Sequence, residues 1–243
     1  MELESLKHEL NGLDIVQQLQ HLAEKFNDKI AFSTSFGWED QVITHLIFSN
    51  NIPIKIFTLE TGRLFPETYY VWSRTLEVYQ QPIHAYYPQT DAVQNMVNRK
   101  GPNSFYESVE DRKECCYIRK MEPLKRALVD NSVWITGIRA EQSANRDDMQ
   151  NLEWDEGNEL IKFHPIFNWG LEEVKNYIKK NNIVYNILHD KGFPSIGCAP
   201  CTRAVQPGED FRAGRWWWED QSEKECGLHG KVGGEKVEGC SKQ

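Results

Sequence analysis

The sequence predicts an α/β fold in which helices cover both faces of a parallel sheet. Three observations support this prediction. Short apolar segments alternate with longer amphipathic segments, small polar residues follow several of the apolar segments, and the chain has 243 residues. Alternating strands and helices form parallel sheets with both faces covered, and this length suffices for one domain with a sizeable core.

The expected elements follow from hydrophobic periodicity. Leucine and valine recur every three or four residues over 1–26, which predicts one or two amphipathic helices. The expected strands are 29–32, 54–57, 83–86 and 132–136, and the expected helices are 39–48, 66–78, 91–99, 113–130 and 171–180. The helix over 113–130 is expected to bend at Pro123.

The last 41 residues have a different composition. Residues 203–243 are rich in glycine and charge and lack sustained periodicity, which is typical of a partly mobile segment. We therefore divide the chain into an α/β domain at 1–202 and a C-terminal segment at 203–243. Within that segment we expect Trp216, Trp217 and Trp218 to dock against the domain.

Composition excludes some classes of partner. The chain carries 28 Lys and Arg against 36 Asp and Glu, a net charge of −8. Proteins that bind nucleic acids usually carry a basic excess, so no such partner is expected, although a small anion responds to local charge. No apolar run is long enough to span a bilayer, and the first ten residues lack the apolar core of a signal peptide. We expect a globular cytoplasmic protein.

Two polar loops follow neighbouring expected strands. The first contains Ser33, Thr34, Ser35, Phe36 and Gly37, and the second contains Thr61, Gly62 and Arg63. In parallel sheets, ligands bind beyond the carboxyl ends of the strands, and a loop before a helix N-terminus suits a phosphate. The alternative is a pair of ordinary turns with Ser and Thr as caps. Arg139 follows a third strand and is expected to point into the same crevice.

Four of the six cysteines form two close pairs. Cys115 and Cys116 are adjacent, at the expected start of a helix, and Cys198 and Cys201 form a C-x-x-C. Such thiols can bind zinc, bind an iron–sulfur cluster, act as a redox dithiol or be merely buried. Adjacent thiolates strain a single-metal site but can each take a different iron of a cubane, which favours a cluster.

Basic residues surround the first cysteine pair. Arg112 and Lys120 are candidates to offset thiolate charge, whereas Lys113 and Arg119 are expected on a solvated helix face. Cys226 follows Lys224 and precedes His229, and a reactive thiolate needs exposure and nearby positive charge. These residues alone leave open whether Cys226 is a nucleophile or a surface cysteine without a role, and Cys240 is taken as incidental.

Taken together, the motifs match a known family. The segments are Ser33-Thr34-Ser35-Phe36-Gly37 with Glu39-Asp40, Leu59-Glu60-Thr61-Gly62-Arg63, Cys115-Cys116, Cys198-Ala199-Pro200-Cys201 and Glu225-Cys226-Gly227-Leu228-His229. In combination they resemble the assimilatory adenylyl-sulfate and phosphoadenylyl-sulfate reductases, over about residues 29–230. The resemblance implies a nucleotide-binding fold similar to the ATP pyrophosphatases. The chain departs from the family pattern at Glu60, where its members commonly have Asp.

The resemblance also implies a reaction in sulfate assimilation and cysteine biosynthesis. Cys226 would attack the sulfur of adenylyl sulfate, displace AMP and carry an S-sulfocysteine, which thioredoxin or a related dithiol protein would reduce to release sulfite. Cys115, Cys116, Cys198 and Cys201 would hold a [4Fe-4S] cluster with a structural and electrostatic role.

Substrate-binding roles are implied residue by residue. The implied substrate-binding set is Ser33, Thr34, Ser35, Phe36, Gly37, Thr61, Gly62, Arg63, Lys120, Arg139, Arg212, Arg215 and His229. Members that carry the cluster mostly use adenylyl sulfate, so that substrate is expected. The 3′-phosphorylated form, or both forms, is the alternative. A zinc-stabilised nucleotide-binding module without redox catalysis is an alternative of another class, and a homo-oligomer is compatible with the sequence.

Overall fold

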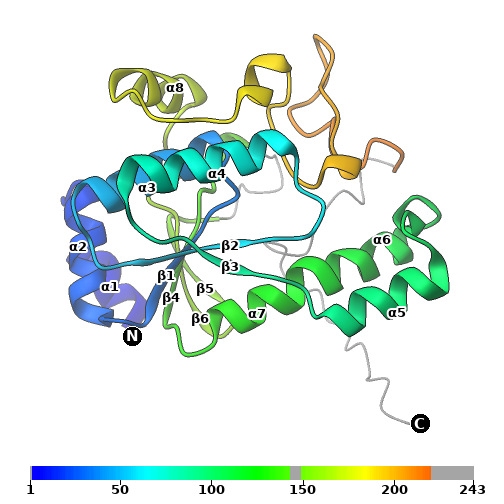
Figure 1. Ribbon diagram of the computed structural model, residues 1–243. Coiled ribbons are helices and arrows are strands. Elements are labelled where there is room, and N and C mark those ends of the chain that lie inside the picture. Colours follow the sequence, from blue (N-terminus) through cyan, green and yellow to red (C-terminus); the bar gives the residue numbers. More distant parts are fainter. Residues whose placement is uncertain (1, 143–148, 220–243) are drawn as a thin grey trace.

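A six-stranded sheet forms the centre of the protein in a computed structural model, which describes residues 2–142 and 149–219 (Figure 1). The strands are β1 (Ile30–Ser33), β2 (Lys55–Leu59), β3 (His84–Tyr86), β4 (Val133–Ile135), β5 (Leu152–Asp155) and β6 (Leu160–Phe163). They lie in the order β3-β2-β1-β4-β6-β5. All neighbouring pairs are parallel except β5 and β6, which pair antiparallel.

Helices cover both faces of this sheet. They are α1 (Glu2–Leu10), α2 (Ile15–Phe26), α3 (Trp38–Ser49), α4 (Pro66–Tyr79), α5 (Thr90–Lys100), α6 (Val109–Cys116), α7 (Glu122–Leu128) and α8 (Leu171–Lys180). Figure 1 shows α3, α4 and α8 on one side of the strands and α7 on the other. The predicted α/β class and all four predicted strands are confirmed.

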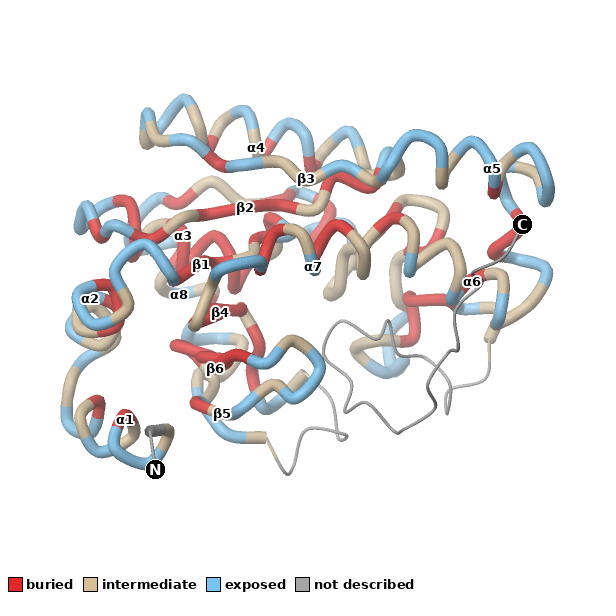
Figure 2. The backbone as a smooth tube through the Cα atoms, turned by 90° about the horizontal axis from the view of Figure 1, so that it is seen from below, coloured by how far each residue is buried: buried red, intermediate tan, exposed pale blue. Residues whose placement is uncertain are grey.

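Strand alternation explains why both faces are apolar. Ile30 and Phe32 of β1 pack into the larger core with α1 to α4 and α8, whereas Ala31 between them packs against α7. Successive side chains of a strand point to opposite faces, so a strand buried on both faces is apolar throughout. Figure 2 shows these central strands as largely buried, with exposed residues on the outer sides of the helices.

The antiparallel hairpin of β5 and β6 was not predicted. Glu153 and Asp155 of β5 pair with Lys162 and Leu160 of β6, and a salt bridge of 2.7 Å joins Asp155 to Lys162. Charged residues in both strands obscure the apolar alternation on which the prediction relied. The sheet is therefore mixed at this edge.

The predicted single helix over 113–130 is wrong in its start and its regularity. The helix begins at Val109, where the Ser108 hydroxyl accepts a hydrogen bond from the Asp111 N–H at 3.0 Å. A π-helical segment, Tyr117–Met121, then separates α6 from α7. Cys115 and Cys116 thus end a helix instead of starting one, and the interruption precedes Pro123.

Residues 203–219 pack against the domain. Thr202 bridges to Arg215 in antiparallel fashion, and the Arg203 N–H donates to the Gly214 carbonyl at 2.9 Å. Trp216 is buried and Trp218 packs against Phe105, while Trp217 stays partly exposed. The docking predicted for the tryptophans is therefore found for Trp216 and Trp218. Over the described residues, no helix is long and apolar enough to cross a membrane.

Candidate active site

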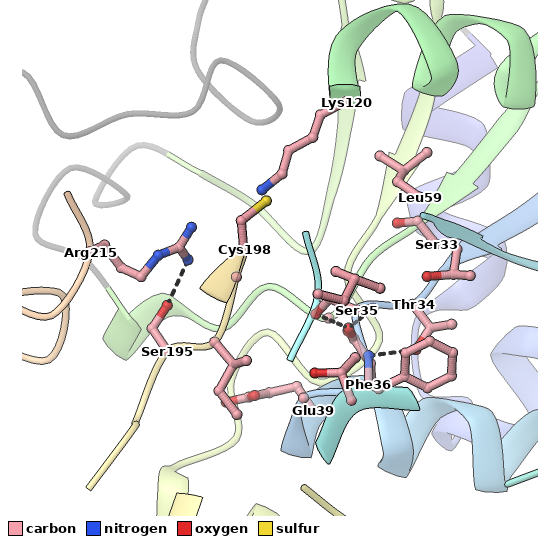
Figure 3. Close-up of a pocket in the computed structure, with 18 of the residues that line it drawn as sticks. Ser33, Thr34, Ser35, Phe36, Glu39, Leu59, Lys120, Ser195, Cys198 and Arg215 are labelled. Carbon is pink, nitrogen blue, oxygen red and sulfur yellow. Dashed lines mark hydrogen bonds between the residues drawn. The ribbon is translucent and has the colours of Figure 1, made fainter. Parts of the chain in front are cut away.

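A cavity of about 260 Å³ lies at the carboxyl ends of the strands. We call it the nucleotide cavity. Its wall includes nine of the predicted substrate-binding residues, namely Ser33, Thr34, Ser35, Phe36, Gly37, Thr61, Lys120, Arg212 and Arg215. Figure 3 shows the first loop below Leu59, with Lys120, Cys198 and Arg215 on the other side of the space. Strand ends and the segment after Cys198 thus meet at one site.

The first loop is held by its own side chains. Asp40 accepts hydrogen bonds from the Ser35 N–H at 2.6 Å and the Ser35 hydroxyl at 2.7 Å. The Phe36 N–H donates to the Thr34 hydroxyl at 3.1 Å, and Phe36 has a left-handed φ of 62°. The N–H groups of Ser35 and Phe36 are therefore already engaged, one by Asp40 of α3 and the other by Thr34.

Asp40 lies in a tight, buried position. Burial is the largest effect on its pKa and raises it from 3.8 to about 6, against the two hydrogen bonds from Ser35. Gly137 makes room for this carboxyl, because a Cβ there would lie 2.2 Å from Asp40 Oδ1. Gly137 therefore allows the chain that leaves β4 to lie close to the start of α3.

Arg139 is placed behind the cavity. Its Nε donates to Glu39 Oε1 at 2.8 Å, and its guanidinium is almost fully buried. Glu39 lines the nucleotide cavity, but Arg139 is not among the wall residues. Arg139 thus reaches the cavity through Glu39, and its direct contact with substrate stays a prediction.

The second loop is shared between two cavities. Thr61 lines the nucleotide cavity, whereas Arg63 lines a smaller one beside the cysteines and donates to Asn103 Oδ1 at 3.1 Å. Gly62 lies between them with a φ of 71°, and its N–H donates to Glu60 Oε1 at 2.7 Å. The side chain of Glu60 therefore closes this loop.

The smaller cavity brings the four predicted cysteines together, and we call it the cysteine cavity. Its wall consists of Arg63, Phe105, Arg112, Cys115, Cys116, Arg119, Lys120, Cys198, Pro200 and Cys201. Within the described residues, no three Cys, His, Asp or Glu side chains meet as ligands of one metal ion. The four thiols nevertheless share this cavity with four cationic side chains.

Burial changes the acidity of these thiols. It raises the pKa of Cys115, and it raises the pKa of Cys201 to about 12, with the neighbouring Cys198 adding to the effect. A thiolate in this place needs compensating positive charge. Arg119 and Lys120 oppose the rise at Cys115 and Cys201 respectively.

The prediction that Arg119 lies on a solvated face is wrong. Arg119 is buried and donates to the Thr61 carbonyl at 2.6 Å, while its Nε finds no hydrogen-bond partner within residues 2–142 and 149–219. The π-helical segment changes the helix face and turns Arg119 inward. Lys113 is exposed, as predicted.

The segment around the C-x-x-C ties both cavities together. Cys198 precedes a 3₁₀ turn, Ala199–Cys201, and the Ala199 N–H donates to the Arg63 carbonyl at 2.8 Å. The Cys198 thiol lies 3.4 Å from the Thr61 hydroxyl. Lys120 and Cys198 line both cavities, and Figure 3 shows their side chains pointing toward one another.

Arg215 extends this wall toward the substrate space. It donates to the Ser195 hydroxyl at 3.2 Å, a contact drawn in Figure 3. Gly197 leaves room for this guanidinium, because a Cβ at that position would make the end of the Arg215 side chain shift. Arg212 also lines the nucleotide cavity. The cationic end of this cavity thus consists of Lys120, Arg212 and Arg215.

Sequence reasoning missed His189, which lies in the short 3₁₀ helix Ile187–Lys191. Its ring stacks on Trp38 with 3.9 Å between centroids, and its Nδ1 lies 2.8 Å from the Phe193 carbonyl. Burial lowers its pKa, so the ring is neutral, Nδ1 carries the proton and Nε2 is an acceptor. Nε2 is buried and has no partner among the residues that the structure describes, and His189 lines the nucleotide cavity. No motif marks this residue, since only the tertiary fold brings it to the site.

Two predicted residues cannot be placed. Cys226, the predicted catalytic thiol, and His229 lie outside the described residues, as does Cys240. The structure ends its description at Glu219, seven residues before Cys226. Their roles stay predictions.

Comparisons with known proteins agree with this geometry. Residues 29–204 match the model of the phosphoadenosine phosphosulfate reductase domain. A protein named adenosine 5′-phosphosulfate reductase from Burkholderia cepacia is 50% identical over 203 residues, which cover 84% of this chain and 81% of that one. A protein of the same name from Allochromatium vinosum is 50% identical over 202 residues, covering 83% of this chain and 79% of that one.

Solved structures support the same fold. The crystal structure of phosphoadenylyl-sulfate reductase from Candida auris has a TM-score of 0.69 and 27% identity, covering 84% of this chain and 96% of that one. Yeast FAD synthetase, at 15% identity and a TM-score of 0.51 over 83% of this chain and 74% of that one, is similar in fold alone. From the matched domain, the close relatives and the shared fold, the chain belongs to the phosphoadenosine phosphosulfate reductase domain family.

Proposed function

We propose that the protein reduces adenylyl sulfate to sulfite and AMP in assimilatory sulfate reduction, with thioredoxin or a related dithiol protein as the electron donor. One observation carries the proposal: the nucleotide cavity and the cysteine cavity share Lys120 and Cys198 as a common wall. Relatives named for reduction of this substrate, at 50% identity over most of the chain, support it.

The cationic side chains at one end of the nucleotide cavity would orient the substrate in it. Lys120, Arg212 and Arg215 suit the phosphosulfate, because cationic side chains bind such oxygens strongly. The first loop, whose N–H groups at Ser35 and Phe36 are engaged, then faces the nucleoside. His189 Nε2, an acceptor without a partner, suits a hydroxyl or amino group of that nucleoside.

The residues of the cysteine cavity fit a [4Fe-4S] cluster. Cys115, Cys116, Cys198 and Cys201 would hold it, and the donor set has the four thiols that such a cluster takes. Arg63, Arg119 and Lys120 would balance the negative thiolates, whereas the charge of Arg112 is paired with Glu219. When bound, the cluster would supply a fixed local charge next to the substrate.

The covalent step belongs to Cys226. Its thiolate attacks the sulfur of adenylyl sulfate, a sulfur–sulfur bond forms, and the bond from sulfur to the phosphate oxygen breaks with AMP as the leaving group. Lys120, Arg212 and Arg215 stabilise the charge that gathers on the leaving phosphate. A donor thiolate then attacks the Cys226 sulfur and sulfite leaves with the electron pair. The second donor thiol resolves the mixed disulfide, which frees Cys226 and leaves the donor oxidised.

Two alternatives remain in the proposal. Reduction of the 3′-phosphorylated substrate, or of both forms, would need an added basic contact for the extra phosphate. A zinc-stabilised nucleotide-binding module would need no reactive Cys226. The cysteine cavity's arginines and its shared wall with the nucleotide cavity favour the reductase.

Trapping the intermediate tests the function. The full-length, anaerobically purified protein is incubated with adenylyl sulfate labelled in its sulfur, without a dithiol donor, and the labelled residue is located by mass spectrometry. Label on Cys226, released as sulfite by reduced thioredoxin, is expected. No label, or equal label in Cys226→Ser, would contradict the proposal. Parallel trapping with the 3′-phosphorylated substrate, together with iron, sulfide and zinc analysis, separates the alternatives.

A further inference from the structure

A buried ion pair joins α6 to the last residue that the structure describes. Arg112 Nε donates to Glu219 Oε1 at 2.8 Å, and Arg112 Nη2 donates to Glu219 Oε2 at 2.8 Å. The two side chains are only 1% and 4% exposed. This is the two-pronged geometry in which guanidinium and carboxylate bind most strongly.

Trp216 connects this pair to both cavities. The guanidinium carbons of Arg112 and Arg215 each lie 4.8 Å from the centre of its ring, and the backbone N–H of Trp216 donates to the Cys201 carbonyl at 3.2 Å. Arg112 lines the cysteine cavity, whereas Trp216 and Arg215 line the nucleotide cavity. The pair therefore sits where the C-terminal segment crosses from one cavity to the other.

Stability alone is a poor reason for such a pair. Removing two charges from water is costly, and apolar residues of similar volume often stabilise a fold equally well. What a buried, bidentate pair provides is one defined position for the two segments that it joins. Here Arg112 precedes Cys115 by three residues, and Glu219 precedes Cys226 by seven.

That spacing limits where the thiol can go. Seven residues span at most about 25 Å when fully extended, so the location of Glu219 sets the region that Cys226 can reach. A chain released further upstream would search a larger volume, and its thiol would meet the substrate sulfur less often.

We propose that Arg112 and Glu219 are positioning residues that anchor the C-terminal segment beside the cysteine cavity and thereby hold Cys226 within reach of the substrate. The inference rests on the proposed function, because it takes Cys226 as the attacking thiol. The delivery of the thiol then depends on one contact at the edge of the cysteine cavity. Disturbing α6 releases the segment, and releasing the segment uncovers Arg112.

Glu219→Gln is the suitable variant, because Glu219 lines neither cavity and the amide keeps its shape while losing its charge. We measure the single-turnover rate of label transfer to Cys226 at saturating adenylyl sulfate, the affinity for AMP and the iron content. The expected result is a transfer rate lower by about tenfold or more, with AMP affinity and iron content unchanged. Glu219→Asp, which keeps the charge, should recover part of the rate.

Glu209→Gln is the matched control. Glu209 lies in the same segment and forms a two-pronged pair with Arg203 at 2.7 and 2.8 Å, but this pair is about one-third exposed. An exposed pair contributes little, so this variant should transfer label at the wild-type rate.

An unchanged transfer rate in Glu219→Gln would overturn the anchor. So would an equal loss of transfer rate in Glu209→Gln, or a loss of transfer rate that follows losses of iron content and thermal stability. If the proposed function itself fails, no label will appear on wild-type Cys226, and a second measurement then tests the anchor independently. Limited proteolysis after residue 219 should be several-fold faster in Glu219→Gln than in wild type and in Glu209→Gln. Equal cleavage in the three proteins would refute the anchor.

Discussion

The two neighbouring cavities are built in different ways. The nucleotide cavity rests largely on regular structure, since Ser33 and Leu59 end parallel strands and Gly137 follows one, and the hydrogen bonds between these strands fix their relative positions. The cysteine cavity rests on irregular structure, namely a π-helical segment and a 3₁₀ turn. The strand-end wall of the first cavity is therefore fixed by the sheet, whereas the second cavity depends on contacts among its own side chains.

The largest expected effect comes from breaking the irregular cavity. Cys198→Ser should remove bound iron and lower adenylyl-sulfate reduction by about 100-fold or more, because the serine hydroxyl is a poor cluster ligand and Cys198 also lines the nucleotide cavity. Iron analysis and steady-state rates check this. Cys240→Ser, outside the recognised motifs, is the control and should retain both properties. Full iron content in Cys198→Ser would contradict the assignment.

The shared wall is the next target. Lys120→Gln should slow label transfer to Cys226 by about 100-fold, because it removes a cation from the leaving phosphate. Iron content should stay unchanged, which separates this effect from that of the cysteine variant. Lys125→Gln, on the exposed face of α7, serves as the control. If Lys120→Gln lost iron and kept the transfer rate, the proposed contact of Lys120 with the leaving phosphate would be contradicted.

The buried carboxyl of Asp40, which holds the first loop of the nucleotide cavity, should make the free energy of unfolding depend on pH. Its pKa is about 6 in the fold against an ordinary 3.8, so the folded state binds the proton more tightly than the unfolded chain. The resulting stabilisation is present at low pH and is lost as pH rises through 6. Between pH 5 and pH 7, wild type should therefore lose about 1 kcal/mol relative to Asp40→Asn. Urea unfolding of both proteins measures the difference, and parallel curves would refute the burial of a charged carboxyl here.

Glu60→Asp should have the smallest effect. Glu60 Oε1 accepts from the Gly62 N–H at 2.7 Å and from the Tyr69 hydroxyl at 3.0 Å. A shorter side chain can keep the first contact and lose the second, at a cost of about 0.5–1.5 kcal/mol in unfolding free energy. Tyr69→Phe should cost a similar amount, and the two changes together less than their sum. Additive losses would show that the two contacts are independent.

The same contrast explains what the sequence could predict. The strands at 29–32 and 54–57 and the loops after them were predictable, because apolar runs and small polar residues report sheet order directly. The cysteines were predictable as a set because thiol chemistry and spacing mark them. The other residues that line the cysteine cavity were not predictable as a set, since the inward orientation of Arg119 depends on a π-helical segment that has no periodic signature.

Other site residues gave no local signal at all. His189 and Ser195 reach the nucleotide cavity through tertiary packing of the segment before Cys198, and neither belongs to a repeating pattern. Arg139 carried a signal that suggested a substrate contact, but its pairing with Glu39 is a long-range contact between residues 100 positions apart. Pattern reading identifies residue types at strand ends, and it cannot say which of them will be neutralised by a distant partner.

The π-helical segment Tyr117–Met121 has a further consequence for changes in chain length. Each residue of an α-helix advances the side-chain direction by about 100°. Before and within this segment, the helix directs thiols and cations to the cysteine cavity, and after it Leu124 and Leu128 face the sheet. A π-turn, whose hydrogen bonds reach one residue further than those of an α-turn, takes up about one extra residue. Removing a single residue here would therefore leave these two faces in phase, whereas removing two would put them out of phase, so that burying one set of side chains would expose the other.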